Sequence, residues 1–171
     1  NNVKRTDNGI AEKSGKKLNT KLANDKYTIS DSHFTITDKE GNDTYKIKSS
    51  AVAVRANDSI RIADGNININ AGTDGLHAEN SSDDTKGYVF IAKGNIKINA
   101  TDDCIHGTSV VQIDDGTLFL NGAEGIEGTY VQINGGKLSI NATGDGINAG
   151  SKSESYKVTI EITGGEINIT L

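Results

Sequence analysis

The sequence of 171 residues contains no proline, methionine or tryptophan, and it has a single cysteine. One cysteine cannot form a disulfide within the chain, so an internal disulfide framework is excluded. No apolar run reaches the roughly 18 residues that a membrane-spanning helix needs, so we expect no membrane span. Large side chains are few, which favours a thin, repetitive core. Because methionine is absent and Asn1 stands first, we expect a mature or trimmed chain that has lost a secretion signal.

Basic residues are concentrated in the first 26 positions. Residues 1–26 carry seven Lys or Arg against three Asp or Glu, and the remainder carries eleven against twenty. An acidic body argues against nucleic acid as a partner, because contacts to a phosphate backbone need Lys and Arg. At this length one domain is the default. We divide the chain into a basic N-terminal arm or cap (1–26) and a repeat region (27–171).

A twelve-residue block recurs in the repeat region in five ungapped copies. It reads [IV]-x-I-x-x-G-x-[IL]-x-[IL]-[NT]-[AGL], and the copies begin at Ile60, Val89, Val111, Val131 and Ile160. Apolar and polar residues alternate on both sides of the glycine, which predicts two short strands with one buried face. A degenerate sixth copy begins at Phe34, with an enlarged turn.

The blocks carry no hairpin signals, and their connections are too short for crossover helices, so we predict that each copy stacks on the next. Like residues would then lie about 4.8 Å apart. The sequence therefore predicts an all-β fold, a parallel β-helix (solenoid) of about five to six coils with Ile, Leu and Val in its core. Four asparagines share one position beside a small residue, which indicates a ladder in a crowded, inward turn. They are Asn70, Asn99, Asn121 and Asn141.

A second motif lies between the blocks and places an acidic residue at a corner. Stacking aligns four such acids, Asp74, Asp103, Glu124 and Asp145. Two carboxylates about 5 Å apart repel by about 3 kcal/mol at an effective dielectric of 20. The acids therefore need solvent, protons or shared cations. Clustered oxygen ligands suit Ca²⁺; solvated turn residues are the alternative.

An outward row follows the apolar residue of each corner. Its members are His77, His106, Glu127 and Asn148. The two histidines leave a transition metal as a further alternative.

Other segments interrupt the repeat. Residues 50–53 (Ser-Ala-Val-Ala) are expected to fill the place that Gly-Leu-His-Ala (75–78) fills later. Residues 80–86 and 151–156 are expected to be polar loops that lengthen two coils. Cys104 replaces a turn glycine, and we expect a partly buried thiol, with an intermolecular disulfide as the alternative.

The run from Asp102 to Ala149 resembles the repeats of a family of bacterial cell-surface carbohydrate-binding proteins with a pectate-lyase-like right-handed parallel β-helix. The resemblance is carried by the D-D-x-I-H turn, E-G-I-E-G, I-N-G-G-x-[IL]-x-I and G-D-G-I-N-A, and it covers roughly residues 60–169. It implies a right-handed helix, secretion to the bacterial cell surface, and binding of plant cell-wall polysaccharides, including acidic ones such as polygalacturonate. It also implies calcium at the acidic turns. Carried over by position, the ligands would be Asp74, Asp102, Asp103, Glu124, Glu127 and Asp145.

Three functions fit this pattern. The first is a non-catalytic, calcium-dependent module that binds polysaccharide. The second is a self-assembling extracellular filament subunit whose open strand edges join head to tail, with the basic arm facing an acidic body. The third is a calcium-dependent polysaccharide lyase, which needs a base such as arginine near the metal. The only arginines, Arg5, Arg55 and Arg61, are expected to lie outside the acidic corners, so we predict that the protein is not an enzyme.

Overall fold

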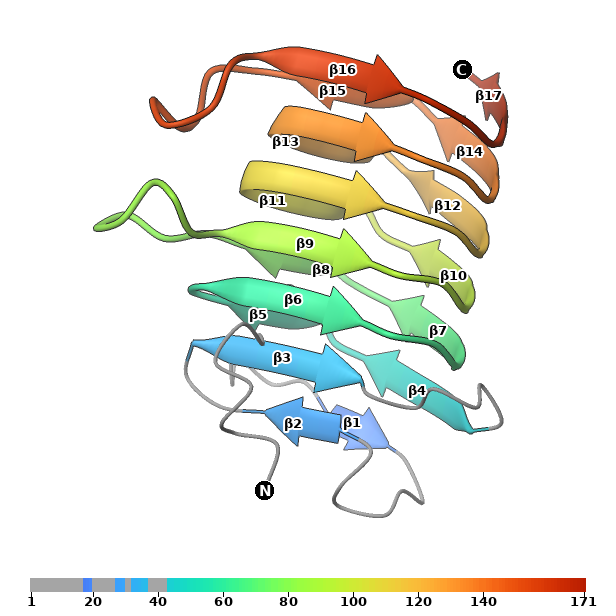
Figure 1. Ribbon diagram of the computed structural model, residues 1–171. Coiled ribbons are helices and arrows are strands. Elements are labelled where there is room, and N and C mark those ends of the chain that lie inside the picture. Colours follow the sequence, from blue (N-terminus) through green and yellow to red (C-terminus); the bar gives the residue numbers. More distant parts are fainter. Residues whose placement is uncertain (1–16, 20–26, 30–31, 37–42) are drawn as a thin grey trace.

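The computed structural model describes residues 17–19, 27–29, 32–36 and 43–171. These residues form strands, turns and loops, and no helix among them could cross a membrane. Figure 1 shows the strands as stacked layers that rise in sequence order from blue to red. The predicted arm or cap (1–26) lies outside the described residues except for one short strand.

The strands form two sheets. The seven-stranded sheet has the order β1 (Lys17–Asn19), β4 (Thr44–Lys48), β7 (Asn66–Asn70), β10 (Asn95–Asn99), β12 (Thr117–Gly122), β14 (Lys137–Ala142) and β17 (Glu166–Thr170). The ten-stranded sheet has the order β15 (Ile147–Ala149), β13 (Glu124–Ile133), β11 (Asp103–Ile113), β9 (Tyr88–Ile91), β6 (Ser59–Ile62), β3 (His33–Ile36) and β2 (Tyr27–Ile29). Beside this path, β16 (Thr159–Ile162) pairs with β13, and β8 (Leu76–Ala78) pairs with β11 and β5 (Val54–Ala56).

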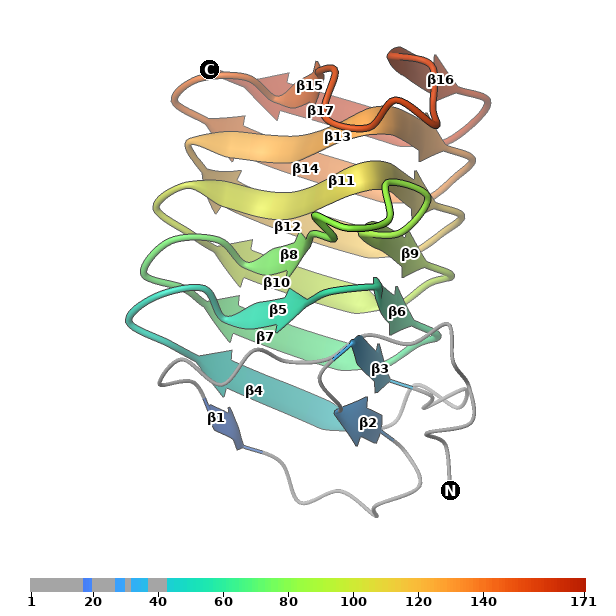
Figure 2. The same cartoon turned by 90° about the vertical axis from the view of Figure 1, so that its left-hand side faces the viewer.

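Pairing is parallel except at the N-terminal edge, where β1 and β2 run antiparallel to β4 and β3. Figure 2 shows that β11 and β13 run on continuously where neighbouring layers are split into two strands, such as β8 and β9. A register shift between Gly107 and Val110 interrupts the pairing of these two long strands. Each of them therefore has two segments: the first segments of β11 and β13 pair with β8 and β15, and the second segments pair with β9 and β16.

The repeat copies lie on one another in register. In the seven-stranded sheet, Ile96 pairs with Ile67 and Leu118, while the alternate residue Lys97 faces solvent. The buried aliphatic residues of both sheets form one continuous core. Phe34 pairs with Ile60, which places the degenerate first copy in the same stack. The prediction of an all-β chain with parallel strands is confirmed; the two sheets are not closed.

The aligned asparagines have the predicted register but not the predicted surroundings. Asn99 pairs with Asn70 and Asn121, and Asn121 pairs with Asn141. The Nδ2 atom of Asn99 donates a 3.1 Å hydrogen bond to Oδ1 of Asn70. However, Asn70, Asn121 and Asn141 are exposed. The predicted inward turn is wrong because strand alternation places this position on the outer face, one residue after a buried Ile or Leu.

The corner motif of the first copy begins three residues later than predicted. Val54 pairs with Leu76 and Arg55 with His77, so residues 53–56, and not 50–53, align with Gly-Leu-His-Ala (75–78). Ala53, which is fully buried, takes the place of the turn glycine. The segment contains several small residues in succession, so its pattern fits more than one register. The correction places Arg55 in line with the histidines.

Cys104 also lies in a glycine position and is completely buried, with a free thiol. A Cβ atom added to Gly122 would lie 2.9 Å from its Sγ atom. The missing side chain at Gly122 thus leaves room for the sulfur. Burial raises the pKa of the Cys104 thiol to about 12, which disfavours the expected alternative of an intermolecular disulfide in the folded chain.

A close backbone approach at Gly125 gives the first prediction. A Cβ atom there would lie 2.4 Å from the carbonyl oxygen of Gly146 and 2.4 Å from Cγ2 of Ile140. We expect Gly125→Ala to lower the free energy of unfolding by about 1–3 kcal/mol, as overpacking does, measured by urea unfolding. Gly150→Ala is the matched control, because an added Cβ there meets no atom within 4 Å. Equal stability of the two variants would contradict the packing.

The raised thiol pKa gives the second prediction. Because the pKa of Cys104 rises from 9.0 to about 12 on burial, the thiolate fraction below pH 9 falls by a factor on the order of a thousand. Alkylation by iodoacetamide at pH 8 should therefore be very slow in the folded chain and fast in urea, as followed by mass spectrometry. Comparable labelling rates with and without urea would show that the thiol is accessible and ionised in the folded state.

Candidate functional site

Two adjacent rows of polar side chains cross β5, β8, β11, β13 and β15. The outer row consists of residues that pair from strand to strand: Arg55, His77, His106, Glu127 and Asn148. The corner acids lie next to it, one at each of four successive corners: Asp74, Asp103, Glu124 and Asp145. Asp103 pairs directly with Glu124, so the predicted stacking of corner acids is confirmed at this step.

Each histidine turns back to the corner acid three residues before it. The Nδ1 atom of His77 lies 2.6 Å from Oδ2 of Asp74, and Nδ1 of His106 lies 2.9 Å from Oδ2 of Asp103. The two imidazole rings stack with centroids 4.3 Å apart and planes 1° from parallel. Both aspartates are buried. The histidines therefore supply partners that the sequence analysis had assigned to solvent or cations.

Glu127 completes a cluster around His106. Its Oε2 atom lies 2.8 Å from Nδ1 of His106. Its Oε1 atom lies 3.1 Å from Nζ of Lys152 and accepts a 3.3 Å hydrogen bond from Nδ2 of Asn148. Ligand atoms of Asp103, His106 and Glu127 all lie within 4.8 Å of one another. The structure thus brings two carboxylates and one imidazole to a single point.

Of the six acids predicted as calcium ligands, two converge at this point, Asp103 and Glu127. The others lie along the corners: Asp74, Asp102, Glu124 and Asp145. The side chains of Asp102 and Asp145 are exposed. His106 was not among the predicted calcium ligands; the sequence analysis considered it only with His77, as an alternative transition-metal site, although the spacing Asp-x-x-His could have joined it to Asp103.

Desolvation, like charges and a histidine partner shift the pKa values of three of these acids, Asp102, Glu124 and Asp74. Partial desolvation by its neighbours raises the pKa of Asp102, and the charges of Asp103 and Asp74 raise it further. Burial also raises the pKa of Glu124, with a contribution from the surrounding carboxylates. Burial acts in the same direction on Asp74, but the hydrogen bond and charge of His77 bring its pKa below the usual value. A histidine partner thus keeps Asp74 ionised.

The donor set of the cluster is unlike that of a calcium site. Calcium takes six to eight oxygen ligands, whereas the described cluster offers two carboxylates and a ring nitrogen. Nitrogen and oxygen together suit zinc and related ions. Calcium at the remaining corner acids stays a prediction.

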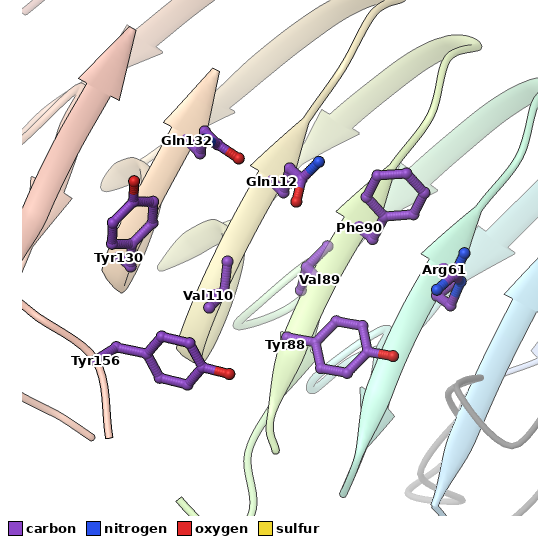
Figure 3. Close-up of a pocket in the computed structure, with 9 residues that line it drawn as sticks. All are labelled: Arg61, Tyr88, Val89, Phe90, Val110, Gln112, Tyr130, Gln132 and Tyr156. Carbon is purple, nitrogen blue, oxygen red and sulfur yellow. The ribbon is translucent and has the colours of Figure 1, made fainter. Parts of the chain in front are cut away.

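A second site lies on the outer face of the ten-stranded sheet. It is a groove of about 560 Å³ across β6, β9, β11 and β13 (Figure 3). We call it the aromatic groove, and it is lined by Arg61, Tyr88, Val89, Phe90, Val110, Gln112, Tyr130, Gln132 and Tyr156. Three of the five tyrosines and one of the three phenylalanines of the chain lie there. The sequence analysis did not place these aromatic residues together.

One row of the groove follows from the repeat register. Arg61 pairs with Phe90, Phe90 with Gln112, and Gln112 with Gln132. The guanidinium carbon of Arg61 lies 4.8 Å from the centroid of Phe90, a cation–π distance. All these residues occupy the polar position between two buried aliphatic residues of the repeat, so the register could have indicated the row.

Tyr130 is held in the groove by an acid of the next layer. Its hydroxyl donates a hydrogen bond to Glu161, and this hydrogen bond raises the pKa of Tyr130. The Nε2 atom of Gln132 lies 3.5 Å from the same carboxylate. Glu161 therefore orients two polar groups of the groove.

The two polar loops meet beside the groove. Oδ1 of Asp84 accepts a 2.7 Å hydrogen bond from the hydroxyl of Ser155, and Oδ2 accepts 3.0 Å hydrogen bonds from the backbone N–H groups of Glu154 and Ser155. The hydroxyl bond lowers the pKa of Asp84. The hydroxyl of Tyr156 donates to the carbonyl of Thr85, at 3.3 Å. The two loops were predicted from the sequence, but the contact between them was not. This contact places Tyr156 at the groove.

A family model described as "Carbohydrate-binding domain-containing protein" matches residues 23–171. No curated protein and no solved structure matches the chain. The matched range contains every strand except β1, and therefore both polar rows and the aromatic groove.

Proposed function

Since the chain belongs to the family of carbohydrate-binding domain-containing proteins, we propose that it binds a polysaccharide in the aromatic groove. The observation that carries this proposal is the gathering of Tyr88, Phe90 and Tyr130 on one sheet face. A sugar ring has apolar C–H faces and a polar rim of hydroxyls. It can pack on aromatic rings while amide and guanidinium groups bind its hydroxyls, as small-molecule sites combine apolar walls with a few polar groups.

The polysaccharide would lie across the strands. Phe90, Gln112 and Gln132 occupy one position on successive strands, and neighbouring strands lie about 4.8 Å apart. A glycan that follows this direction meets a new side chain of the row at each strand. Arg61 at one end can pair with a carboxylate, so acidic glycans such as polygalacturonate belong to the proposed ligands.

We also propose that the two sheets belong to a right-handed parallel β-helix. In-register parallel layers linked by short turns are what a right-handed parallel β-helix requires, and right-handed connections between parallel strands are the strong rule. A polysaccharide ligand and a carbohydrate-binding family are consistent with a secreted protein at the bacterial cell surface.

A non-catalytic role is favoured by the pairing of the nearby cations. Arg55 stands in the outer row beside His77, at a corner (51–54) that carries no acid of its own. Its guanidinium is nevertheless paired with Glu79 at 2.9 Å. Lys152 is paired with Glu127 at 3.1 Å. A lyase needs a deprotonated base, and neither ion-paired group supplies one.

Glycan binding is tested by replacing one groove ring. We expect Phe90→Ala to weaken binding to immobilised polysaccharide at least about tenfold, which corresponds to 1.4 kcal/mol, because a stacking face is lost. Affinity gels with polygalacturonate and with neutral xylan measure the effect. The same samples should release no unsaturated oligosaccharides.

Phe119→Ala is the matched control. Phe119 is 49% exposed on the seven-stranded sheet, where it lines a separate, smaller groove of about 280 Å³. Loss of binding in this variant, with normal binding by Phe90→Ala, would move the glycan site to the other sheet. No binding by the unmodified protein to any polysaccharide would reject the proposed function.

A second candidate function is self-association through the exposed edge at β16 and β17. Among the described residues, β16 pairs with β13 and β17 with β14, and core-facing side chains of this layer are partly uncovered: Ile160 at 44% exposure, Ile162 at 53% and Ile169 at 45%. Strand edges with free backbone groups and apolar side chains can pair with a second copy. This edge is the observation that favours the predicted filament subunit.

Sedimentation velocity over a concentration series tests this second candidate. We expect mass to grow with concentration and Ile162→Glu to reduce this growth strongly, because it places a charge in the contact. Ser139→Glu, an exposed position on β14, is the control. A monomer at all concentrations would rule out self-association.

A further inference from the structure

Two carboxylates converge on one ring nitrogen in the cluster at His106. A neutral imidazole nitrogen carries at most one proton, yet Oδ2 of Asp103 lies 2.9 Å and Oε2 of Glu127 lies 2.8 Å from the same Nδ1 atom. Two carboxylate oxygens and one nitrogen therefore face a common point. The side chains of all three residues are only 11–12% exposed, so solvent screens the two negative charges poorly.

Neighbouring residues hold the cluster so that Oδ2 of Asp103, Nδ1 of His106 and Oε2 of Glu127 face one another. Oε1 of Glu127 is already engaged by Lys152 and Asn148, which leaves Oε2 directed at His106. The ring of His106 is stacked on the parallel ring of His77 at 4.3 Å. This contact fixes the plane of the imidazole. Second-shell contacts of this kind orient metal ligands in proteins.

Among the described layers, one pair of adjacent strands, β11 and β13, brings Asp, His and Glu side chains together. In the outer row, His106 pairs with His77 on one side and with Glu127 on the other. The step before joins His77 to Arg55, and the step after joins Glu127 to Asn148. At the step from β8 to β11, His77 and His106 each face an aspartate, but among the described residues only Asp103, His106 and Glu127 bring three ligand atoms within 4.8 Å of one another.

We infer that Asp103, His106 and Glu127 form a binding site for a zinc-class divalent metal ion. The ligand atoms are Oδ2, Nδ1 and Oε2. Zinc accepts imidazole nitrogen and carboxylate oxygen and is often held by three protein ligands with a fourth position open. Calcium does not take nitrogen ligands in this way. The ion joins β11 to β13 and offsets the charge of both acids. It takes the place of the calcium that the resemblance implies for these two acids.

The site is independent of the proposed glycan function. The aromatic groove lies beyond the register shift at Gly107 and Val110, on the other segments of β11 and β13. Failure of metal binding would leave the glycan proposal standing, and failure of glycan binding would leave the metal site standing.

Calorimetric titration of the full chain, stripped with EDTA, tests the inference with ZnCl₂ and CaCl₂ alone. We expect Zn²⁺ to bind at one site per chain and Ca²⁺ to bind more weakly there. His106→Gln and Glu127→Gln should each weaken Zn²⁺ binding at least about tenfold, since even second-shell changes reach that size. Cobalt(II) should give visible absorption bands that change in His106→Gln, because a nitrogen ligand is lost.

His33→Gln is the matched control. His33 lies on β3, 3.6 Å from Asp58 and away from the cluster, and its replacement should leave Zn²⁺ affinity unchanged. Circular dichroism of each variant shows whether it folds, and Glu127→Gln keeps the shape of the side chain. Zn²⁺ affinity that is unchanged in both His106→Gln and Glu127→Gln would overturn the inference. Tighter binding of Ca²⁺ than of Zn²⁺ at these residues would also overturn it and would support calcium instead.

Discussion

The parallel stacking of each repeat copy on the next, residue above like residue, is the constraint on which the molecule depends. It builds the core without large side chains, because Ile96 contacts Ile67 on one strand and Leu118 on another. The same constraint places the corner acids above one another, and their negative charges repel. One arrangement therefore produces both the main stabilising feature and the main electrostatic cost.

The repulsion between the corner acids is reduced because the residue type changes along the outer row. This row begins with Arg55, continues through two histidines and Glu127, and ends at Asn148. The histidines hold the aspartates, and Lys152 reaches Glu127 from outside the row. On the inward side most residues stay aliphatic from copy to copy, with Phe34, Tyr45 and Cys104 as exceptions. Most of the sequence divergence between copies therefore lies on the solvent-facing side of the strands, where the two proposed sites are.

Much of the fold could be predicted from the sequence because the repeat is local and frequent. Alternation around each glycine gave the strands, and five ungapped copies gave the parallel register. The prediction was wrong where the pattern is degenerate: several small residues precede Arg55, and the corner could be placed in two registers. The asparagine row was placed inward although the alternation itself turns it outward. Both errors came from weighing small neighbouring residues more than periodicity.

The sites were predicted less well, because they depend on which different residues share a position. The acids were found by their repetition, whereas His106 and the groove residues differ from copy to copy. Phe90 and Gln112 do not look alike, yet they stand next to each other. The contact between Asp84 and Ser155 joins residues 71 positions apart, and no repeat pattern indicates it.

That loop contact has a mechanical consequence. In a stack where each layer touches only its neighbours, the terminal layer can peel away by itself, and fraying proceeds one layer at a time. Asp84 precedes β9 and Ser155 precedes β16, and the strands between them are β11 and β13. The hydrogen bonds between the loops therefore link the layer of β9 directly to the layer of β16, across β11 and β13. Detaching β16 from β13 requires these hydrogen bonds to break as well, which ties the loss of this layer to the layer that contains β9.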